Sequence, residues 1–335
     1  MTIPARPALL PLVPLYRLAL GLGELRFRTG LGPVRRLRWP VISVGSLSAG
    51  GAGKTPMTIA LARALTGRGL QVDVLSRGYG RRGKSALRVD PNGAAEEYGD
   101  EPLLIAREAG VPVYVAAQRY QAGLLADADR SDTPVIHLLD DGFQHRQLHR
   151  DVNILLLDEN DLTAERLLPA GNLREPPSAM RRADVIAIPA GGHTASLESD
   201  LRARGFKGPV WRLRRRMEVP AIDGPVAAFC GIARPAQFFA SLETAGLQLA
   251  ARLAFPDHHP YTAHDLDRIQ TAAQAAGARA TVTTEKDRVR LGRLSERFTD
   301  LLPLQTAKLR IEIEDELSAL NWLQGRFAQA SALTR

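Results

Sequence analysis

The chain has 335 residues, with a hydrophobic content of 45% and a charged content of 24%, which are ordinary values for a soluble globular protein of about two domains. Its single cysteine, Cys230, excludes a disulfide framework and fits a reducing compartment. The net charge is +8, but aromatic residues make up only 5% and are not interleaved with basic ones, so no nucleic-acid partner is expected.

The first forty residues are basic and apolar. They hold seven arginines against one acid, Glu24. Proline and arginine interrupt the apolar stretch 8–20, and because no run of about 18 apolar residues exists, we expect no membrane-spanning helix. A basic segment rich in leucine suits the surface of an anionic membrane. The alternative is an N-terminal helix packed on its own domain, and these residues alone leave both interpretations open.

A glycine-rich loop, SAGGAGKT, occupies residues 48–55. The apolar run 41–44 before it predicts a buried strand, and helical spacing of apolar residues over 57–65 predicts a helix after it. In this order, backbone N–H groups and a helix N-terminus point at phosphate. The loop therefore predicts a nucleoside triphosphate site made of Ser48, Ala49, Gly50, Gly51, Ala52, Gly53, Lys54 and Thr55. Lys54 is expected at the terminal phosphates and the Thr55 hydroxyl on Mg²⁺, although Ser48 replaces the usual first glycine.

Predicted strands and helices alternate along the rest of the chain. Strands are expected at 70–75, 111–116, 135–139, 152–157, 185–188, 226–230, 247–255 and 280–284, with helices at 101–109, from 235 and from 263. This pattern predicts an α/β fold with a P-loop NTPase-type, mostly parallel sheet and helices on both faces. The basic stretch 212–220 suggests a linker or an exposed ribbon. We therefore divide the chain into a membrane-associating segment 1–40, a P-loop domain 41–217 and a smaller C-terminal α/β domain 218–335.

Two carboxylates, Asp140 and Asp141, follow a predicted apolar strand. Beside a phosphate-binding loop, a carboxylate at a strand end is where such folds hold Mg²⁺. We expect Asp141 to contact the ion directly or through water, with Asp140 orienting it. The alternative for adjacent aspartates is a solvated turn.

Seven short motifs occur in order along the chain. They are GGAGKTP at 50–56, SRGYG at 76–80, GDEP at 99–102, DDGFQH at 140–145, PAGNLRE at 169–175, FPDHH at 255–259 and TTEKD at 283–287. Together they resemble the tetraacyldisaccharide 4′-kinase (lipid A 4′-kinase) family of Gram-negative bacteria over nearly the whole chain. The resemblance implies a P-loop kinase that uses ATP and Mg²⁺ to phosphorylate the 4′-hydroxyl of a tetraacylated glucosamine disaccharide 1-phosphate, giving lipid IVA. It also implies peripheral or monotopic attachment to the cytoplasmic face of the inner membrane through the N-terminal segment.

Phosphoryl transfer needs positioning, charge neutralisation and a base for the attacking hydroxyl. Asp100, in a Gly-Asp-Glu-Pro turn at a helix start, is the candidate base, and its alternative is a surface turn. By resemblance it pairs with a histidine from the C-terminal domain, which closes over the active site. The motif favours His258, although the adjacent His259 leaves the register open.

Further charged and polar side chains are expected near the phosphates. Arg77 and Arg119 are candidate clamps on phosphate or transition-state charge, although ordinary surface arginines are common in so arginine-rich a chain. The candidate partners of Mg²⁺ or its water ligands are Glu101, Gln144, His145 and Glu175.

Two other functional classes are compatible with a phosphate-binding loop. A P-loop GTPase or metallochaperone would use nucleotide as a switch, but no Asn-Lys-x-Asp guanine-reading segment is present, and neither Ser48 nor Ala49 is the lysine of dimeric switch ATPases. A non-enzymatic membrane module with a vestigial loop is disfavoured because Lys54, Thr55, Asp100 and Asp141 are all intact.

Overall fold

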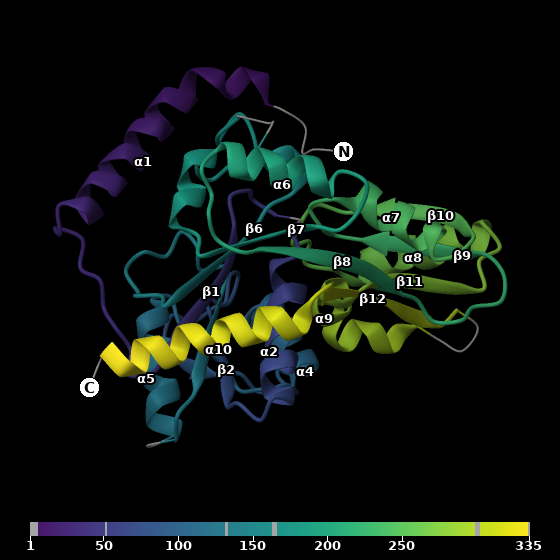
Figure 1. Cartoon of the computed structure of the whole chain (residues 1–335). Coiled ribbons are helices and arrows are strands. Elements are labelled where there is room, and N and C mark those ends of the chain that lie inside the picture. The colour runs from purple at the N-terminus through teal and green to yellow at the C-terminus, as the bar shows by residue number, and fades with distance from the viewer. Residues whose placement is uncertain (1–5, 51, 131–132, 163–165, 299–301, 334–335) are drawn as a thin grey trace.

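The protein has an α/β fold built on one large, mostly parallel sheet, which confirms the predicted fold class (Figure 1). The structure is a computed structural model that describes residues 6–50, 52–130, 133–162, 166–298 and 302–333. Its strands are β1 (Val41–Ser46), β2 (Val72–Ser76), β3 (Leu87–Arg88), β4 (Val113–Val115), β5 (Ile136–Asp140), β6 (Val152–Leu156), β7 (Val185–Pro189), β8 (Val210–Glu218), β9 (Val226–Cys230), β10 (Leu249–Ala254), β11 (Ala280–Thr284) and β12 (Leu304–Ile313).

Helices connect these strands and cover the sheet. They are α1 (Val13–Arg28), α2 (Lys54–Gly67), α3 (Ala95–Tyr98), α4 (Asp100–Ala109), α5 (Arg119–Arg130), α6 (Thr194–Ala203), α7 (Pro235–Thr244), α8 (Ala263–Ala275), α9 (Glu285–Leu291) and α10 (Glu316–Leu333). Short 3₁₀ turns occupy Pro7–Leu12, Glu159–Asp161, Pro177–Arg182 and Gly292–Arg297.

The sheet consists of two parallel blocks joined by one antiparallel pair. The strand order is β10-β9-β11-β12-β8-β7-β6-β1-β5-β2-β4-β3. Pairing is parallel within each block apart from the edge pair β3–β4, whereas β8 and β12 run antiparallel. Because β1, β2 and β5 are parallel neighbours, their carboxyl ends lie along the same edge, where α/β sheets bind ligands.

The stretch predicted as a linker or exposed ribbon is strand β8. Trp211 and Leu213 are buried while Arg212 and Arg214 are exposed, so side chains alternate between the two faces as a half-buried strand requires. The linker alternative is therefore wrong. β12 and α10, which the sequence analysis did not predict, follow at the end of the chain; β12 pairs with β8.

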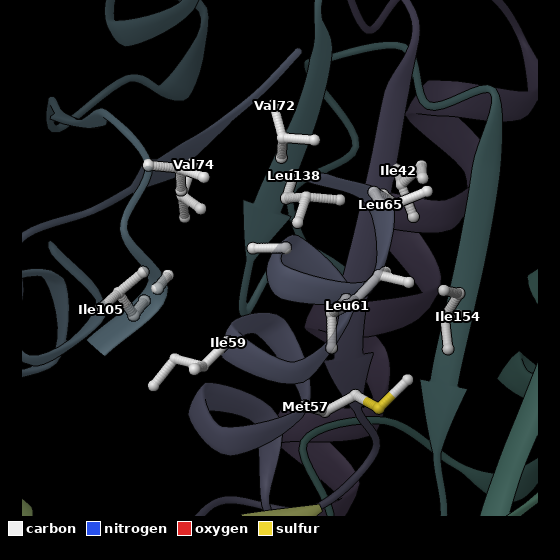
Figure 2. Packing of buried hydrophobic residues seen from close by; sticks show 14 of the residues in the cluster. Ile42, Met57, Ile59, Leu61, Leu65, Val72, Val74, Ile105, Leu138 and Ile154 are labelled. Atoms are coloured by element: carbon white, nitrogen blue, oxygen red, sulfur yellow. The ribbon is translucent and has the colours of Figure 1, made fainter. Parts of the chain in front are cut away.

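The phosphate-loop helix α2 packs into the main hydrophobic core. Met57, Leu61 and Leu65 are fully buried against strand residues such as Ile42 and Ile154 (Figure 2). The cluster also holds buried residues of α10, among them Leu320 and Leu323, and Figure 1 shows this yellow helix crossing beside α2. The chain therefore returns from its C-terminal part to support α2 from outside.

Helix α1 forms an arm along the outside of the molecule (Figure 1). Together with the preceding 3₁₀ turn it makes a helical segment, Pro7–Arg28, that is long and apolar enough to cross a membrane by length and composition. Such a candidate span was not expected from the sequence, which has no run of about 18 apolar residues. Pro11 lies in the 3₁₀ turn and Pro14 in the first turn of α1, where a missing N–H costs little, so neither ends the helix.

Candidate active site

The phosphate-binding loop joins β1 to α2, as its sequence predicts. Gly50 and Gly53 have φ angles of 74° and 84°, in the left-handed region that glycine adopts without steric cost. Gly51 lies outside the described residues. Lys54 and Thr55 begin α2, and Thr55 is 2% exposed. The loop therefore has the backbone shape that directs N–H groups toward phosphate.

Neighbouring segments hold this loop on both sides. The N–H of Ala49 donates to the Asn172 carbonyl at 2.8 Å. Nη2 of Arg215, on β8, donates to the Ala52 carbonyl at 3.0 Å. Ser48 is fully buried, so the residue that replaces the usual glycine serves as part of the packed loop base.

Lys54 lies against the acidic end of β5. Its Nζ is 3.3 Å from Ser46 Oγ, to which it donates, and 3.7 Å from Asp141 Oδ1. Burial lowers the pKa of Lys54, partly opposed by the charge of Asp141. A lysine with so few protein partners is available to neutralise a phosphate anion.

Asp140 and Asp141 have different surroundings. Asp140 is 1% exposed and accepts a hydrogen bond from Thr58 Oγ1 at 3.1 Å. Burial, with the charges of Glu101 and Asp141, raises the pKa of Asp140 to about 7. Burial acts in the same direction on Asp141, but Lys54 and Arg174 outweigh it and lower the pKa of Asp141. Nη1 of Arg174 donates to Asp141 Oδ2 at 2.8 Å.

This end of the sheet suits a Mg²⁺ ion. Oδ1 of Asp141 is buried without a hydrogen-bond partner, and Asp140 and the Thr55 hydroxyl supply further oxygen donors. Among the described residues no three His, Cys, Asp or Glu side chains form a metal cage. Mg²⁺ does not need one, because it is usually held by one or two carboxylates, phosphate oxygens and water.

Asp100 and His258 meet from distant parts of the chain. His258 Nδ1 lies 3.1 Å from Asp100 Oδ2, across 158 residues of sequence. Asp100 begins α4 after Gly99, whose φ is 89° and whose Cβ, if it had one, would lie 2.9 Å from the Tyr79 carbonyl. Glycine therefore lets this turn pack on the SRGYG segment, and the Glu101 N–H donates to Asp100 Oδ1 at 2.9 Å.

The charge states of Asp100 and His258 follow from these contacts. The hydrogen bond to Asp100 is the main cause that raises the pKa of His258. Burial acts to raise the pKa of Asp100, but the His258 hydrogen bond and the Arg290 charge together lower it. The pair is therefore a carboxylate beside a histidine that is readily protonated.

Backbone strain marks the same region. Among the described residues, Asp141 and His258 are the two non-glycine residues with positive φ, at 48° and 59°. Such conformations are uncommon outside glycine and tend to occur at functional sites.

The histidine register is resolved by the contacts of the two rings. His258 faces Asp100, whereas His259 Nε2 lies 3.0 Å from Asp265 Oδ2 and its ring stacks on Phe255 at 4.8 Å between centroids. His259 therefore contributes to packing and to the start of α8, and the structure brings His258 to Asp100.

The remaining predicted site residues differ in whether they lie close to Asp140 and Asp141. Arg119, 8% exposed at the start of α5, acts electrostatically on Asp141 and Asp140, with the exposed Arg77 near it. Glu101 forms an ion pair with Lys286 of α9 and raises the pKa of Asp140.

Three further predicted residues are Gln144, His145 and Glu175. Gln144 Nε2 donates to the Ser46 carbonyl at 3.0 Å. Burial, then Arg119, lowers the pKa of His145 to about 4. Glu175 forms an ion pair with Arg182 and, in the described part of the chain, contacts neither Asp140 nor Asp141, whereas the adjacent Arg174 pairs with Asp141. The structure thus does not bring Glu175 to the predicted metal site.

Comparison with known proteins agrees with this arrangement. The family model for LpxK, tetraacyldisaccharide-1-P 4′-kinase, matches residues 5–328. The chain belongs to the tetraacyldisaccharide 4′-kinase family. A tetraacyldisaccharide 4′-kinase of Koribacter versatilis is 40% identical over 93% of this chain and 96% of its own, and one of Geobacter metallireducens is 41% identical over 84% and 88%. The crystal structure of LpxK from Aquifex aeolicus in complex with ATP superposes with a TM-score of 0.73, at 32% identity, over 96% of this chain and 99% of that chain.

In this member of the tetraacyldisaccharide 4′-kinase family, sequence reasoning missed three cations at the site. Arg174 and Lys286 lie inside recognised motifs without an assigned role, and Arg290 lies just beyond TTEKD. The available signal was the spacing of Lys286 and Arg290, which places both on one face of a helix that begins with an acidic turn.

Proposed function

We propose that this chain transfers the γ-phosphate of ATP to the 4′-hydroxyl of a tetraacylated glucosamine disaccharide 1-phosphate. One observation carries the proposal: in a chain of this family, helix α2, which begins with Lys54, packs against α4, where Asp100 meets His258, and Lys54 interacts electrostatically with Glu101, the neighbour of Asp100. A phosphate cradle and a carboxylate–histidine pair are the two parts that phosphoryl transfer to an alcohol needs.

The phosphate side follows from the loop. Backbone N–H groups of the glycine loop, other than that of Ala49, would hold the phosphates, and Lys54 Nζ would neutralise charge on the transferred group. Thr55, Asp140 and Asp141 would hold Mg²⁺, which supplies positive charge at the phosphate oxygens. Burial raises the pKa of Asp140 to about 7, and a bound cation would favour its anionic form. Arg119 adds a buried positive charge, and Arg77 an exposed one, on the same side.

The acceptor side depends on the Asp100–His258 pair. Asp100 is nearly buried with a side-chain exposure of 7%, whereas that of His258 is 35%. The Asp100 carboxylate serves as the base for the acceptor hydroxyl, and His258, hydrogen-bonded to it, orients the carboxylate and stabilises its charge. Because Asp100 belongs to range 41–217 and His258 to 218–335, the two ranges must approach for the pair to form, and this closure excludes water from the γ-phosphate.

The direct test is to incubate the protein with ATP, Mg²⁺ and the tetraacylated disaccharide 1-phosphate. We expect one phosphate added to the distal sugar, seen by mass spectrometry and ³¹P NMR. Lys54→Ala is the matched inactive variant, with kcat reduced by roughly 10²-fold or more. Absence of product with the unaltered chain would contradict the proposal. GTP-selective hydrolysis without lipid transfer would favour a switch protein instead.

We also propose that α1 attaches the enzyme to the cytoplasmic face of the inner membrane. Leu15, Leu18, Leu22 and Leu25, one face of α1, are 56–64% exposed. The opposite face contacts the body, where Tyr16 donates to the Arg174 carbonyl at 2.8 Å. An apolar stripe beside arginines suits an anionic lipid surface.

Substituting the four leucines with serine tests this attachment. We expect loss of binding to anionic vesicles while ATP affinity is retained, with Leu317→Ser, which removes an exposed leucine of α10, as the matched control. Unchanged partitioning to vesicles would place membrane contact elsewhere on the molecule.

A further inference from the structure

Helix α9 presents two cations to the two acids that begin α4. Lys286 and Arg290 are four residues apart and so share one helix face. Lys286 forms an ion pair with Glu101, and Arg290 contacts Asp100 Oδ2 through Nε at 2.7 Å and Nη2 at 2.5 Å. The adjacent acids Asp100 and Glu101 of α4 are thus each paired with a cation of α9.

The Arg290 guanidinium is itself held in place by Asp287 and the Gly231 carbonyl. Its side chain is 6% exposed, and Nη1 donates to Asp287 Oδ1 at 3.0 Å and to the Gly231 carbonyl at 2.5 Å. Asp287 is fully buried and also accepts hydrogen bonds from the Tyr261 hydroxyl and the Gly231 N–H, each at 3.1 Å. A planar guanidinium held at one end offers its remaining N–H groups in a single orientation.

Arg290 also reaches the histidine of the pair. Its Nη2 lies 3.3 Å from His258 Nδ1, so Asp100, His258 and Arg290 meet around one carboxylate oxygen. The orientation of the Asp100 carboxylate is therefore set by Arg290, whose side chain is held by buried residues of the C-terminal block.

We infer that Arg290, held by Asp287, is a positioning residue that fixes the Asp100 carboxylate for proton transfer from the acceptor hydroxyl. This inference rests on the proposed function, since it assigns how the Asp100–His258 pair is kept in register. Arg290 touches neither the phosphate loop nor Lys54 in the contacts of the described residues, so its effect is confined to the acceptor side.

Kinetics of three Arg290 variants, beside the unaltered chain, separate this role from a structural one. For Arg290→Gln we expect kcat to fall by roughly 10- to 100-fold, the scale of a misplaced reacting group, with the KM for ATP unchanged. Arg290→Lys should recover part of this loss because it keeps one cation at Asp100, and Arg290→Ala should recover none. Arg288→Ala is the matched control, an exposed arginine on the same helix that does not face Asp100.

The outcomes are distinct. Phosphorylation by the unaltered chain with equal kcat in Arg290→Gln overturns the inference and leaves the proposed function standing. Equal losses in Arg290→Lys and Arg290→Gln, tracking lost thermal stability, also overturn it, since they indicate a structural role. If the unaltered chain makes no product, the proposed function fails. A double-mutant cycle of Arg290→Gln with Asp100→Asn in urea unfolding then still tests the contact, and zero coupling overturns the inference.

Discussion

Two of the histidine–aspartate pairs among the described residues, those of His137 and His258, differ in burial and in the partners that surround the ring. On β5, His137 Nδ1 lies 2.7 Å from Asp73 Oδ1 of β2, and its Nε2 lies 3.1 Å from Asp127 Oδ1 of α5. His258 and Asp100 form the other pair, at 3.1 Å. The His137 side chain is 0% exposed, whereas that of His258 is 35% exposed.

The comparison shows why a buried histidine–aspartate pair does not by itself indicate a catalytic site. Both ring nitrogens of His137 are engaged by carboxylates inside regular secondary structure, so no atom is left for a substrate. His258 lies in a strained loop, keeps an exposed edge and is joined to its partner from another part of the fold. We therefore propose a structural role for His137 and a catalytic role for His258.

Catalytic substitutions should show the largest difference between the pairs. For Asp100→Ala and His258→Ala, we expect kcat to fall by roughly 10²- to 10⁴-fold, the range for loss of general acid–base catalysis, with little change in ATP affinity. Steady-state kinetics with the lipid acceptor measure this. His259→Ala is the neighbouring control. If it proves the damaging change, the partner of Asp100 is shifted by one residue.

His137→Ala should give the reverse pattern. Removing the imidazole leaves the buried Asp73 with only its longer ion pair to Arg130, at 3.7 Å, so we expect the free energy of unfolding to fall by about 3–5 kcal/mol. Urea denaturation measures the loss, and kcat per folded molecule should remain near that of the unaltered chain. A variant with intact stability and lost turnover would reverse the assignment of the two histidines.

The pH dependence of stability sharpens the contrast. Burial alone lowers the pKa of His137, but the hydrogen bonds to Asp127 and Asp73 outweigh it and raise this pKa from 6.5 to about 9. A raised folded-state pKa gives stability that is complete below pH 6.5 and lost as the pH rises through 9. We expect the free energy of unfolding to fall by at most about 3 kcal/mol over this window. The slope should be absent in His137→Asn, and a slope of equal size there would contradict the assignment.

Local features of the site could be predicted from the sequence, and contacts between distant segments could not. β1, the glycine loop, α2 and the end of β5 follow from short-range patterns, as do Lys54 and Asp141. By contrast, Arg290 meets Asp100 across 190 residues, and no local pattern specifies that contact. His137 was treated only as part of an apolar strand, because its partners lie on other elements.

The missed elements have similar reasons. β12 mixes charged and apolar residues because its charged side chains form ion pairs, as Arg310 does with Glu285 and Glu108. Helix α1 continues past its prolines because they lie near its start, a position that composition alone does not identify.

The most direct test of the catalytic pair is a double-mutant cycle on kcat with Asp100→Ala, His258→Ala and the combined variant. Because groups that act as one unit are not additive, the double variant should lose little more than the more damaging single variant. Multiplicative losses, equal to the product of the two single effects, would contradict the account by showing that Asp100 and His258 act independently.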